Sequence, residues 1–446
     1  MKIAHAGDRA LLVEIGDVPA AQLHAAAAAM RAIPGVRACI VGQSSLYVVF
    51  DGRPDIEAVR GAEAAPPSSR PATLHRIAVS FRDEYGPDLR ELLSAARITR
   101  DAFLDRVARV PLTARYVGFR GGFAYLDGWP AEWAMPRRPT SRPRVPRGTF
   151  AVAGSVAAFY PIDSPGGWNL LGRTARPLEH AIAPGDEIRL EPMLDPIEES
   201  PVRASAGSDL PFPLELKAAP LATLVMAADW SGIARGVPPG GPFDEMAAAS
   251  ANRSVGNDPG APLLECALAG PEAIAREDRV CSWFGAEARI RVDDAEVPDP
   301  RQFDLAASRR LRIGRITGGM RGYLAAGRKR GEVDELRRGD RLTIRAAAGP
   351  HDAPFREMVC EVTPQLDRVG IRMRVISPAG LTAPSDLPSC GMQCGTVQLH
   401  PDGSVVAMGP DHPVTGGYLQ PMTVNSAERW KLAQLVPGER VRFVAR

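Results

Sequence analysis

The stretch Pro184-Gly-Asp-Glu-Ile-Arg-Leu190 joins a glycine turn to a run in which apolar and charged residues alternate. Such alternation is typical of a half-buried β-strand, and glycine permits the tight turn that leads into it. The pattern recurs at Arg338-Gly-Asp-Arg-Leu-Thr-Ile344 and at Pro437-Gly-Glu-Arg-Val-Arg-Phe443, and Gly122-Phe-Ala-Tyr-Leu-Asp-Gly128 similarly resembles Gly322-Tyr-Leu-Ala-Ala-Gly327. Glycine turns also precede unrelated strands, but duplication is the better account. We therefore expect two related β-rich halves in tandem.

Length and composition agree with a β-rich chain of more than one domain. The 446 residues exceed the usual size of a single hydrophobic core. The 42 prolines and 43 glycines are spread among short Val/Ile/Leu runs, which favours many short strands joined by defined turns and disfavours long helical bundles. Short helices are expected at 20–33, 90–96, 100–107 and 245–254.

Two stretches rich in proline and serine divide the chain. They predict a small α/β cap over 1–75, a first β-rich body over 76–200, a linker over 201–213 and a second body over 214–446.

Charge and cysteine content exclude several classes of protein. The 54 basic and 52 acidic residues leave a formal charge of +2 without long blocks of either sign, so neither a nucleic-acid nor a membrane partner is expected. The chain has no leader-like segment and no apolar run long enough for a membrane helix, which predicts a cytoplasmic location. Six cysteines in so long a chain do not indicate a disulfide framework. No metal site is legible, because Cys390 and Cys394 lack a second Cys/His pair nearby in sequence.

One glycine-rich stretch could carry chemistry in the first body. Ser164-Pro-Gly-Gly-Trp-Asn-Leu-Leu-Gly-Arg-Thr174 can expose backbone N–H groups, and Arg173 could clamp a carboxylate or phosphate. The stretch lacks the GxxxxGK[ST] order of a phosphate loop, so it does not by itself predict nucleotide binding. A tight barrel corner with Trp168 as core filler is an equal alternative.

The second body has two further stretches of interest. Asp244 follows the rigid turn Gly236-Val-Pro-Pro-Gly-Gly-Pro-Phe and stands where a helix N-cap belongs, so capping is its expected duty. Thr415-Gly-Gly-Tyr418 offers a hydroxyl and a phenol beside a glycine pair, with Asp411 close by. These residues could form a pocket rim or a simple Gly-Gly hairpin turn. The seven histidines are scattered and form no hydrolase or metal motif.

At these motifs the chain resembles the fused B and C subunits of bacterial 5-oxoprolinase. The same family includes allophanate hydrolase subunits 1 and 2, the carboxyltransferase-type module of urea carboxylase, and a kinase-inhibitor and antagonist pair. The first half matches through Gly7-Asp-Arg-Ala-Leu-Leu-Val-Glu14, Gly86-Pro-Asp-Leu89, Gly118-Phe-Arg-Gly-Gly-Phe-Ala-Tyr-Leu126, Pro136-Arg-Arg138 and the SPGGWNLLGRT block. The second half matches through GVPPGG, Asp244, Ala251-Asn252, Val255-Gly-Asn257, Glu265, Asp367-Arg-Val-Gly-Ile-Arg372, Thr415-Gly-Gly-Tyr418 and the closing PGERVRF.

The resemblance implies a mainly β fold with an α/β cap and two cyclophilin-like β-barrels in tandem. It also implies a small amide, lactam or urea-type substrate bound between the barrels, ATP as a possible co-substrate, and a separate A-type subunit as a possible partner. On this basis the expected catalytic residues are Arg173, Asp244, Arg368 and Tyr418. The expected substrate-binding residues are Phe119, Phe123, Tyr125, Arg138, Ser164, Trp168, Asn252, Glu265, Asp411, Thr415, Gly416 and Gly417.

The chain departs from the family pattern mainly at polar positions. Val107 stands where relatives usually have histidine, Gln420 stands where a basic residue often follows the TGGY segment, and Met226 and Trp230 lie in a segment that has lost most of its polar residues. Three hypotheses follow. The chain is a 5-oxoprolinase-like ATP-dependent hydrolase, a divergent enzyme of specialised metabolism that uses the same cleft, or a non-catalytic regulatory protein like the kinase-inhibitor members.

Overall fold

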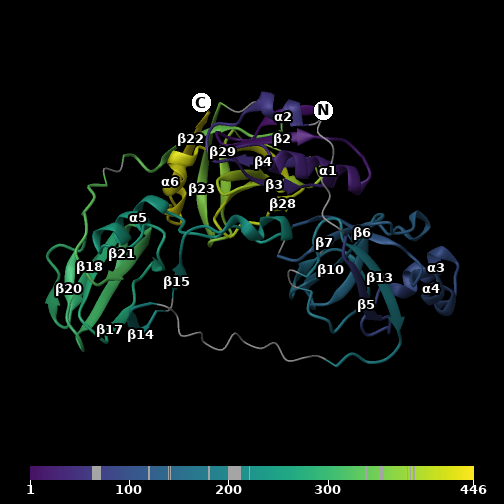
Figure 1. Ribbon diagram of the computed structural model, residues 1–446, viewed down its shortest axis with the longest axis horizontal. Coiled ribbons are helices and arrows are strands. Elements are labelled where there is room, and N and C mark those ends of the chain that lie inside the picture. Colours follow the sequence, from purple (N-terminus) through teal and green to yellow (C-terminus); the bar gives the residue numbers. More distant parts are fainter. Residues whose placement is uncertain are drawn as a thin grey trace.

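The fold was examined in a computed structural model, which describes residues 1–62, 72–118, 121–138, 140, 142–178, 181–198, 212–219, 221–336, 339–351, 356–378, 380–381, 383–384 and 387–445. Figure 1 shows four sheet-based parts: a cap, a first barrel, a large open sheet and a second barrel. The predicted fold class is confirmed, since the chain is mainly β and contains two closed seven-stranded barrels. The predicted linker over 201–213 lies almost wholly outside the described residues.

The cap is a four-stranded antiparallel sheet with two helices. Helix α1 presents Leu23, Ala27 and Met30 to the sheet, because residues four and three apart share one helix face. The opposite face of the sheet packs on the second barrel through Ile40, Tyr47 and other apolar side chains. Its elements, in sheet order for the strands, are β1 (Lys2–His5), β2 (Ala10–Glu14), β4 (Ser45–Phe50) and β3 (Val36–Val41), with α1 (Ala20–Arg31) and α2 (Ile56–Ala62).

The first barrel closes because its last strand, β13, pairs in parallel with its first strand, β5. Its interior holds Phe81, Phe103, Phe150 and other buried apolar side chains. The barrel strands are β5 (Leu74–Ser80), β6 (Leu112–Val117), β7 (Ala124–Asp127), β9 (Thr149–Ala153), β10 (Val156–Phe159), β12 (Asn169–Arg173) and β13 (Glu187–Met193). Beside them lie the pair β8 (Arg142–Val145) and β11 (Ser164–Gly166), and α3 (Leu89–Ala96), α4 (Arg100–Val107) and η1 (Ala131–Trp133).

The second barrel repeats this topology strand for strand. Its last strand, β30, pairs in parallel with its first strand, β22, and its neighbours follow in the order found in the first barrel. The strands are β22 (Thr343–Ala348), β23 (Glu357–Leu366), β24 (Gly370–Ser377), β26 (Thr396–Leu399), β27 (Ser404–Met408), β29 (Leu419–Val424) and β30 (Arg440–Ala445). The pair β25 (Cys390–Gly391) and β28 (Thr415–Gly416) corresponds to β8 and β11, and η3 (Ser426–Glu428) and α6 (Arg429–Ala433) precede β30.

The predicted duplication is therefore confirmed. Of the three copies of the glycine turn and alternating strand, two occupy equivalent places in the two barrels. Gly185 and Gly438 both have positive φ, of 90° and 87°, which glycine adopts without steric cost, and each leads into the closing strand of its barrel. The copy at Leu342 to Ile344 instead enters the opening strand β22. The proposed similarity of 122–128 to 322–327 was wrong as a repeat, because β7 belongs to the first barrel while 322–327 belongs to the open sheet, and the counterpart of β7 is β24.

An eight-stranded open sheet stands where the range 214–446 was expected to hold one barrel. The sheet forms because the long strands β18 and β21 pair along most of their lengths and bury one face around Trp283 and Leu324. Its elements are β14 (Leu214–Ala218), β15 (Ala222–Val225), η2 (Trp230–Arg235), α5 (Glu245–Ser254), β16 (Leu263–Ala267), β17 (Glu272–Ala275), β18 (Arg279–Val292), β19 (Ala295–Glu296), β20 (Phe303–Leu305) and β21 (Arg310–Gly327). The barrel of this half is thus confined to Thr343–Ala445.

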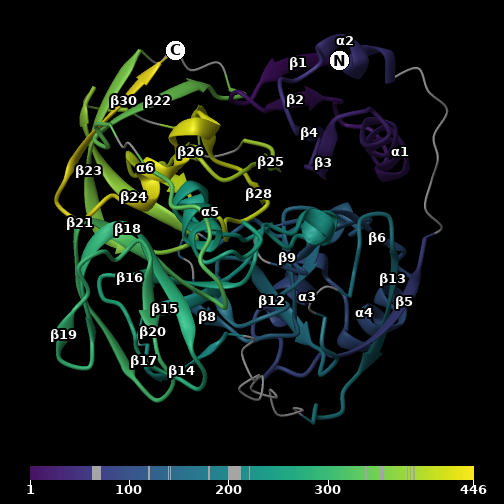
Figure 2. The same cartoon turned by 60° about the vertical axis from the view of Figure 1, so that its left-hand side comes forward.

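The parts meet around the second barrel. Figure 1 shows the purple cap beside the yellow-green second barrel, with the open sheet on one side and the blue first barrel on the other. The cap and second barrel are joined directly, since Gly7 N–H donates to Ala348 C=O at 3.1 Å. In Figure 2, β25 and β28 lie between the cap strands and the first barrel. This position places the Thr415-Gly-Gly-Tyr418 stretch where the cap and the two barrels meet.

Candidate functional site

The two barrels touch where the first barrel's β6–β7 connection meets β28 of the second. A methyl group added to Gly118 would lie 1.5 Å from the Thr415 hydroxyl oxygen, so the two residues are in direct contact. The Tyr116 hydroxyl and the Ser389 side chain form a hydrogen bond. The backbone N–H of Gln43, in the cap, donates to the Ser389 carbonyl at 2.7 Å. Ser389 therefore connects the cap and both barrels.

We call the six residues at this contact the inter-barrel site: Tyr116, Gly118, Gln398, Thr415, Gly416 and Gln420. Gln398 belongs to it because a methyl group added to Gly416 would lie 2.7 Å from Gln398 Nε2. Gln420 belongs to it because its Nε2 donates to the Cys390 Sγ at 3.2 Å, and Cys390 pairs with Gly416 across β25 and β28. Burial raises the pKa of Cys390 to about 12, so this thiol stays neutral.

Three polar atoms of the inter-barrel site are buried without a hydrogen-bond partner among the described residues. They are Gln398 Nε2, the Thr415 hydroxyl oxygen and Gln420 Oε1. The residues that carry them are 3%, 2% and 0% exposed. Leaving a buried polar atom unpaired costs about 1–3 kcal/mol, and folded proteins contain only a few such atoms. Three such atoms lie around one contact between the barrels, which makes this contact the candidate site.

These atoms include both a hydrogen-bond donor and a hydrogen-bond acceptor. An amide nitrogen such as Gln398 Nε2 donates, a carbonyl oxygen such as Gln420 Oε1 accepts, and the Thr415 hydroxyl can do either. The backbone N–H of Gln420 is already engaged, since it donates to His351 Nδ1 at 2.9 Å. Burial lowers the pKa of His351, which keeps this acceptor nitrogen neutral. A small neutral group with an acceptor beside a donor carries the kinds of hydrogen-bonding atom that these three atoms lack.

The first barrel contributes an aromatic cluster behind the contact. Tyr116 stacks on Tyr125 with ring centroids 4.2 Å apart, and Trp168 packs edge-on against Tyr125 and Phe123, each at 5.8 Å. Three residues predicted to bind substrate are thus brought together. The rings pack against one another, as expected for Trp168 as core filler, and Ser164 is buried at the start of β11. Phe119 lies outside the described residues.

A second group of predicted residues meets in a buried ion-pair network. Arg368 donates from Nε and Nη2 to both Asp411 carboxylate oxygens, at 2.8 and 3.0 Å, and from Nη1 to Glu265 Oε1 at 2.8 Å. Its Nη2 also donates to the Gly241 carbonyl at 2.8 Å, which fastens the GVPPGG turn. Burial opposes the charge, but Asp411 and Glu265 raise the pKa of Arg368 above its usual range. Arg368 therefore anchors this junction of open sheet and barrel.

Asp244 performs the capping duty that the sequence predicts. Its Oδ1 accepts from the Ala247 N–H of α5 at 3.0 Å, and its Oδ2 accepts from Gln434 Nε2 at 3.0 Å. The Asp244 N–H donates to the Tyr323 hydroxyl, which donates to Glu265 Oε2 at 3.0 Å. Asp244 thus connects the helix, the open sheet and the second barrel.

Gly417 lies beside Ser389, and four other predicted residues belong to neither group. Arg173 Nε donates to the Arg147 carbonyl at 2.9 Å within the first barrel, and Arg138 pairs with Asp88 at 3.2 Å there. Asn252 donates to the carbonyls of Pro259 and Ala261 and so holds the loop after α5. Tyr418 packs its ring against His400, with centroids 4.2 Å apart. The structure does not bring Arg173 and Arg368 to one site.

Sequence reasoning missed several residues of both groups. Gln398 and Ser389 give no motif, and Gln420 was noticed only as a departure from the family. Arg321, which lies 3.4 Å from Glu265 and donates from Nη1 to the Ala433 carbonyl at 2.9 Å, could have been found, because a charged residue within the apolar run of β21 is unusual.

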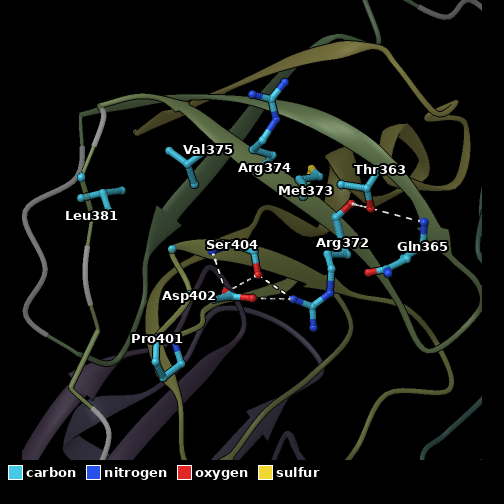
Figure 3. Close-up of a pocket in the computed structure, with 12 residues that line it drawn as sticks. Thr363, Gln365, Arg372, Met373, Arg374, Val375, Leu381, Pro401, Asp402 and Ser404 are labelled. Carbon is cyan, nitrogen blue, oxygen red and sulfur yellow. Dashed lines mark hydrogen bonds and ion pairs between the residues drawn. The ribbon is translucent and has the colours of Figure 1, made fainter.

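Figure 3 shows a separate surface pocket on the second barrel. It has a volume of about 610 Å³, and Arg372 crosses it to donate to Ser404 Oγ at 2.6 Å. None of the predicted site residues lines it.

The described residues contain no group of three or more His, Cys, Asp or Glu side chains placed to hold a metal ion. Among the described helices, none is long and apolar enough to cross a membrane.

The chain is a carboxyltransferase-domain protein with both halves of the domain in one chain. Residues 1–180 match the family model for carboxyltransferase domain subdomains C and D, and residues 235–353 and 328–445 match the model for subdomains A and B. The chain belongs to the family of the B and C subunits of 5-oxoprolinase, as a fused B/C type of low identity to its relatives.

Three comparisons describe this membership. The chain is 30% identical over 197 residues to the B subunit of 5-oxoprolinase from Bacillus subtilis, covering 39% of this chain and 82% of that protein. It is 28% identical over 260 residues to the C subunit of 5-oxoprolinase from Escherichia coli, covering 46% of this chain and 81% of that protein. The crystal structure of TTHA0988 is similar over 98% of this chain and 99% of that one, with a TM-score of 0.82 and 25% identity.

A larger relative is matched only in part. Urea amidolyase of Saccharomyces cerevisiae is 25% identical over 281 residues, which is 47% of this chain but 15% of that protein.

Proposed function

We propose that this chain binds a small amide, lactam or urea-type substrate at the inter-barrel site and acts as a 5-oxoprolinase-like hydrolase. The observation that carries the proposal is the set of buried polar atoms on Gln398, Thr415 and Gln420 that have no hydrogen-bond partner in the part of the chain that the structure describes. Amides, lactams and ureas each present a carbonyl acceptor beside an N–H donor. Gln398 would donate to the carbonyl oxygen, and Gln420 would accept from the N–H. Membership of the 5-oxoprolinase family supports the same class of substrate.

The chemical task explains why donors at the carbonyl matter. Opening an unactivated amide is slow because its resonance must be broken while negative charge develops on oxygen. A fixed donor such as Gln398 Nε2 would stabilise this charge more strongly in a buried site than in water. Water does not compete for the hydrogen bond there, and the donor needs no reorganisation. The Thr415 hydroxyl could serve as a second donor to the same oxygen. The aromatic cluster of the first barrel would exclude water from one side.

The described residues do not offer a phosphate loop for ATP. The SPGGWNLLGRT stretch forms β11 and β12 in place of a loop that opens a helix, and Arg173 points its Nε at a backbone carbonyl. We therefore propose that ATP-dependent activation depends on a separate A-type subunit, and we derive no step of the reaction through ATP. Arg368, Asp244 and Asp411 would support the reaction by holding the second half rigid.

The experiment is phosphate release from ATP in the presence of 5-oxoproline or urea, with and without an A-type subunit. The proposal predicts substrate-dependent release that requires the A-type subunit and falls at least tenfold in Gln420→Leu. The matched control is Gln365→Leu, an exposed glutamine on the same barrel, which should keep full activity. Absence of turnover with both substrates would contradict hydrolase activity. Recovery of another bound metabolite by mass spectrometry would then favour a divergent enzyme, and a co-purified protein without small ligand would favour a regulator.

A further inference from the structure

A second pocket lies between the cap and the second half, away from the inter-barrel site. Its volume is about 360 Å³, which is enough for a small metabolite. The cap contributes Arg9 and Arg37, η2 contributes Trp230, and α6 contributes Arg429 and Trp430. We call these five residues and the space they surround the cap pocket. None of the six residues of the inter-barrel site lines it.

The charged residues of the lining have a net positive charge. Arg9, Arg37 and Arg429 line the cap pocket, and Glu245 is the one carboxylate among its described lining residues. Three guanidinium groups converge here from two distant parts of the sequence. Because each guanidinium carries five N–H donors in a planar fork, such a group matches carboxylate and phosphate oxygens.

The hydrogen bonds that the three arginines make to the described residues do not use all of their N–H donors. Arg429 donates from Nη2 to Gln393 Oε1 at 3.1 Å, while its buried Nε has no hydrogen-bond partner among the described residues. Arg9 donates from Nε to Ser426 Oγ at 3.3 Å and from Nη1 to the Asp51 carbonyl. Arg37 donates from Nε to Asp51 Oδ1 at 2.5 Å. Asp51 thus accepts hydrogen bonds from two arginines, and within the described part of the chain the terminal nitrogens of Arg37 make no hydrogen bond.

Several other residues of the lining are aromatic or aliphatic. Trp230 and Trp430 provide two indole rings, and the guanidinium of Arg37 lies 5.7 Å from the Trp230 ring centroid. Val49 adds an aliphatic contact from the cap, and Met246 lines the opening with 52% of its surface exposed. Flexible methionine beside aromatic rings is typical of surfaces that receive apolar groups. The pocket therefore holds aromatic and aliphatic side chains beside cationic donors.

We propose that the cap pocket binds a small planar molecule that carries an oxyanion, either a carboxylate or a phosphate. The oxyanion contacts Arg37 and Arg429, and the planar part packs against the tryptophans. Since cap and second barrel both contribute, the ligand joins these two parts and stabilises their contact by binding only the folded state. This site goes beyond the proposed function and does not depend on it.

The test is calorimetric titration of the full chain with 5′-AMP and with benzoate, which carry the two oxyanions on planar rings. Adenosine and benzamide serve as uncharged counterparts. The proposal predicts saturable binding of 5′-AMP, benzoate or both, at least tenfold tighter than the uncharged counterpart. Binding of 5′-AMP alone identifies a phosphate ligand, and binding of benzoate alone identifies a carboxylate ligand. The proposal would be overturned if neither 5′-AMP nor benzoate showed saturable binding up to 10 mM. That concentration is about tenfold above the dissociation constant of about 1 mM expected for a weak specific ligand.

Variants separate the cap pocket from adventitious binding. Arg429→Gln and Arg37→Gln should each weaken binding at least tenfold, whereas Arg144→Gln, an exposed arginine paired with Asp163 on the first barrel, should leave it unchanged. Arg37 is 45% exposed in its side chain, so its variant should fold even where Arg429→Gln does not. Unchanged affinity in Arg37→Gln would overturn the assignment. Loss of hydrolase activity with intact 5′-AMP or benzoate binding would count only against the proposed function.

Discussion

Gly118 of the first barrel lies directly against Thr415 of the second, so closely that a methyl group on Gly118 would sit 1.5 Å from the Thr415 hydroxyl oxygen. The φ angle of Gly118 is not positive, so the glycine is required for space and not for backbone conformation. The contact sets how near the two barrels approach. It also positions the Thr415 hydroxyl within the inter-barrel site.

Gly118→Ala should therefore push the barrels apart. We expect a loss of about 1–3 kcal/mol in the free energy of unfolding, as for other overpacked contacts, together with weaker substrate binding. Chemical denaturation followed by tryptophan fluorescence measures the first effect. The double variant Gly118→Ala, Thr415→Gly removes the clash and should recover stability but not binding. A single variant as stable as the parent would show that the barrels do not touch at Gly118.

Arg368→Ala should be among the most destabilising substitutions of the second half. The substitution removes the ion-pair partner that lies nearest to Glu265, whose side chain is 3% exposed. Breaking a buried pair from one side costs about 3–5 kcal/mol. Arg374→Ala removes an exposed pair with Glu361 and should cost about 1 kcal/mol or less. Equal effects of the two variants in chemical denaturation would contradict the anchoring role of Arg368.

Asp244→Ala tests the joint between helix, sheet and barrel. The variant loses an N-cap, worth about 0.5–2 kcal/mol, and leaves Gln434 Nε2 buried without its acceptor, which adds about 1–3 kcal/mol. Thr99→Ala is the matched cap, because Thr99 accepts from Ala102 N–H at the start of α4 and is exposed. Asp244→Ala should lower the midpoint of thermal unfolding more than Thr99→Ala. The reverse order would rule out the second contact as a stabilising one.

The sequence predicted the repeat and the local elements well, because both depend on neighbouring residues. Glycine turns before alternating strands marked the closing strand of each barrel, and the expected helices appear as α1, α3, α4 and α5. The open sheet was not foreseen, since β18 and β21 have the same alternation as barrel strands. Alternation shows that a strand is half-buried but not which sheet it joins.

The sites were predicted only in part, for a different reason. Arg368 and Glu265 are 103 positions apart, and Gln398 meets Gly416 only because the fold brings β26 and β28 together. Motifs recovered the residues that belong to glycine-rich turns. They could not recover single glutamines on strands, whose importance comes from one buried side-chain atom that has no hydrogen-bond partner among the described residues.

Acid should destabilise the fold through His412. This side chain is 1% exposed, and burial, with Arg429 nearby, lowers its pKa from 6.5 to about 4. Its stabilising contribution is complete above pH 6.5 and is lost as the pH falls toward 4, because only the unfolded chain takes up the proton in that range. The slope is about 1.4 kcal/mol per pH unit, or about 3 kcal/mol in total. His412→Gln should flatten the pH dependence of unfolding measured by denaturant titration. An unchanged slope would contradict the burial of a neutral His412.

In the inter-barrel site, a substitution that removes a buried polar atom should keep or raise the stability of the free protein and weaken substrate binding. Gln398→Met replaces a buried amide, whose Nε2 has no hydrogen-bond partner among the described residues, by an apolar side chain of similar length. Removing an unsatisfied polar group is neutral or stabilising in the free protein, so the unfolding midpoint should stay level or rise. The same change removes the donor proposed for the substrate carbonyl.

The most direct measurement is calorimetric titration of the parent chain and Gln398→Met with 5-oxoproline, with the unfolding midpoint of each protein recorded alongside. The account predicts saturable binding to the parent, at least tenfold weaker binding to Gln398→Met, and an unfolding midpoint that does not fall. Equal affinity in the two proteins, or no binding to the parent at any attainable concentration, would contradict a substrate site between the barrels.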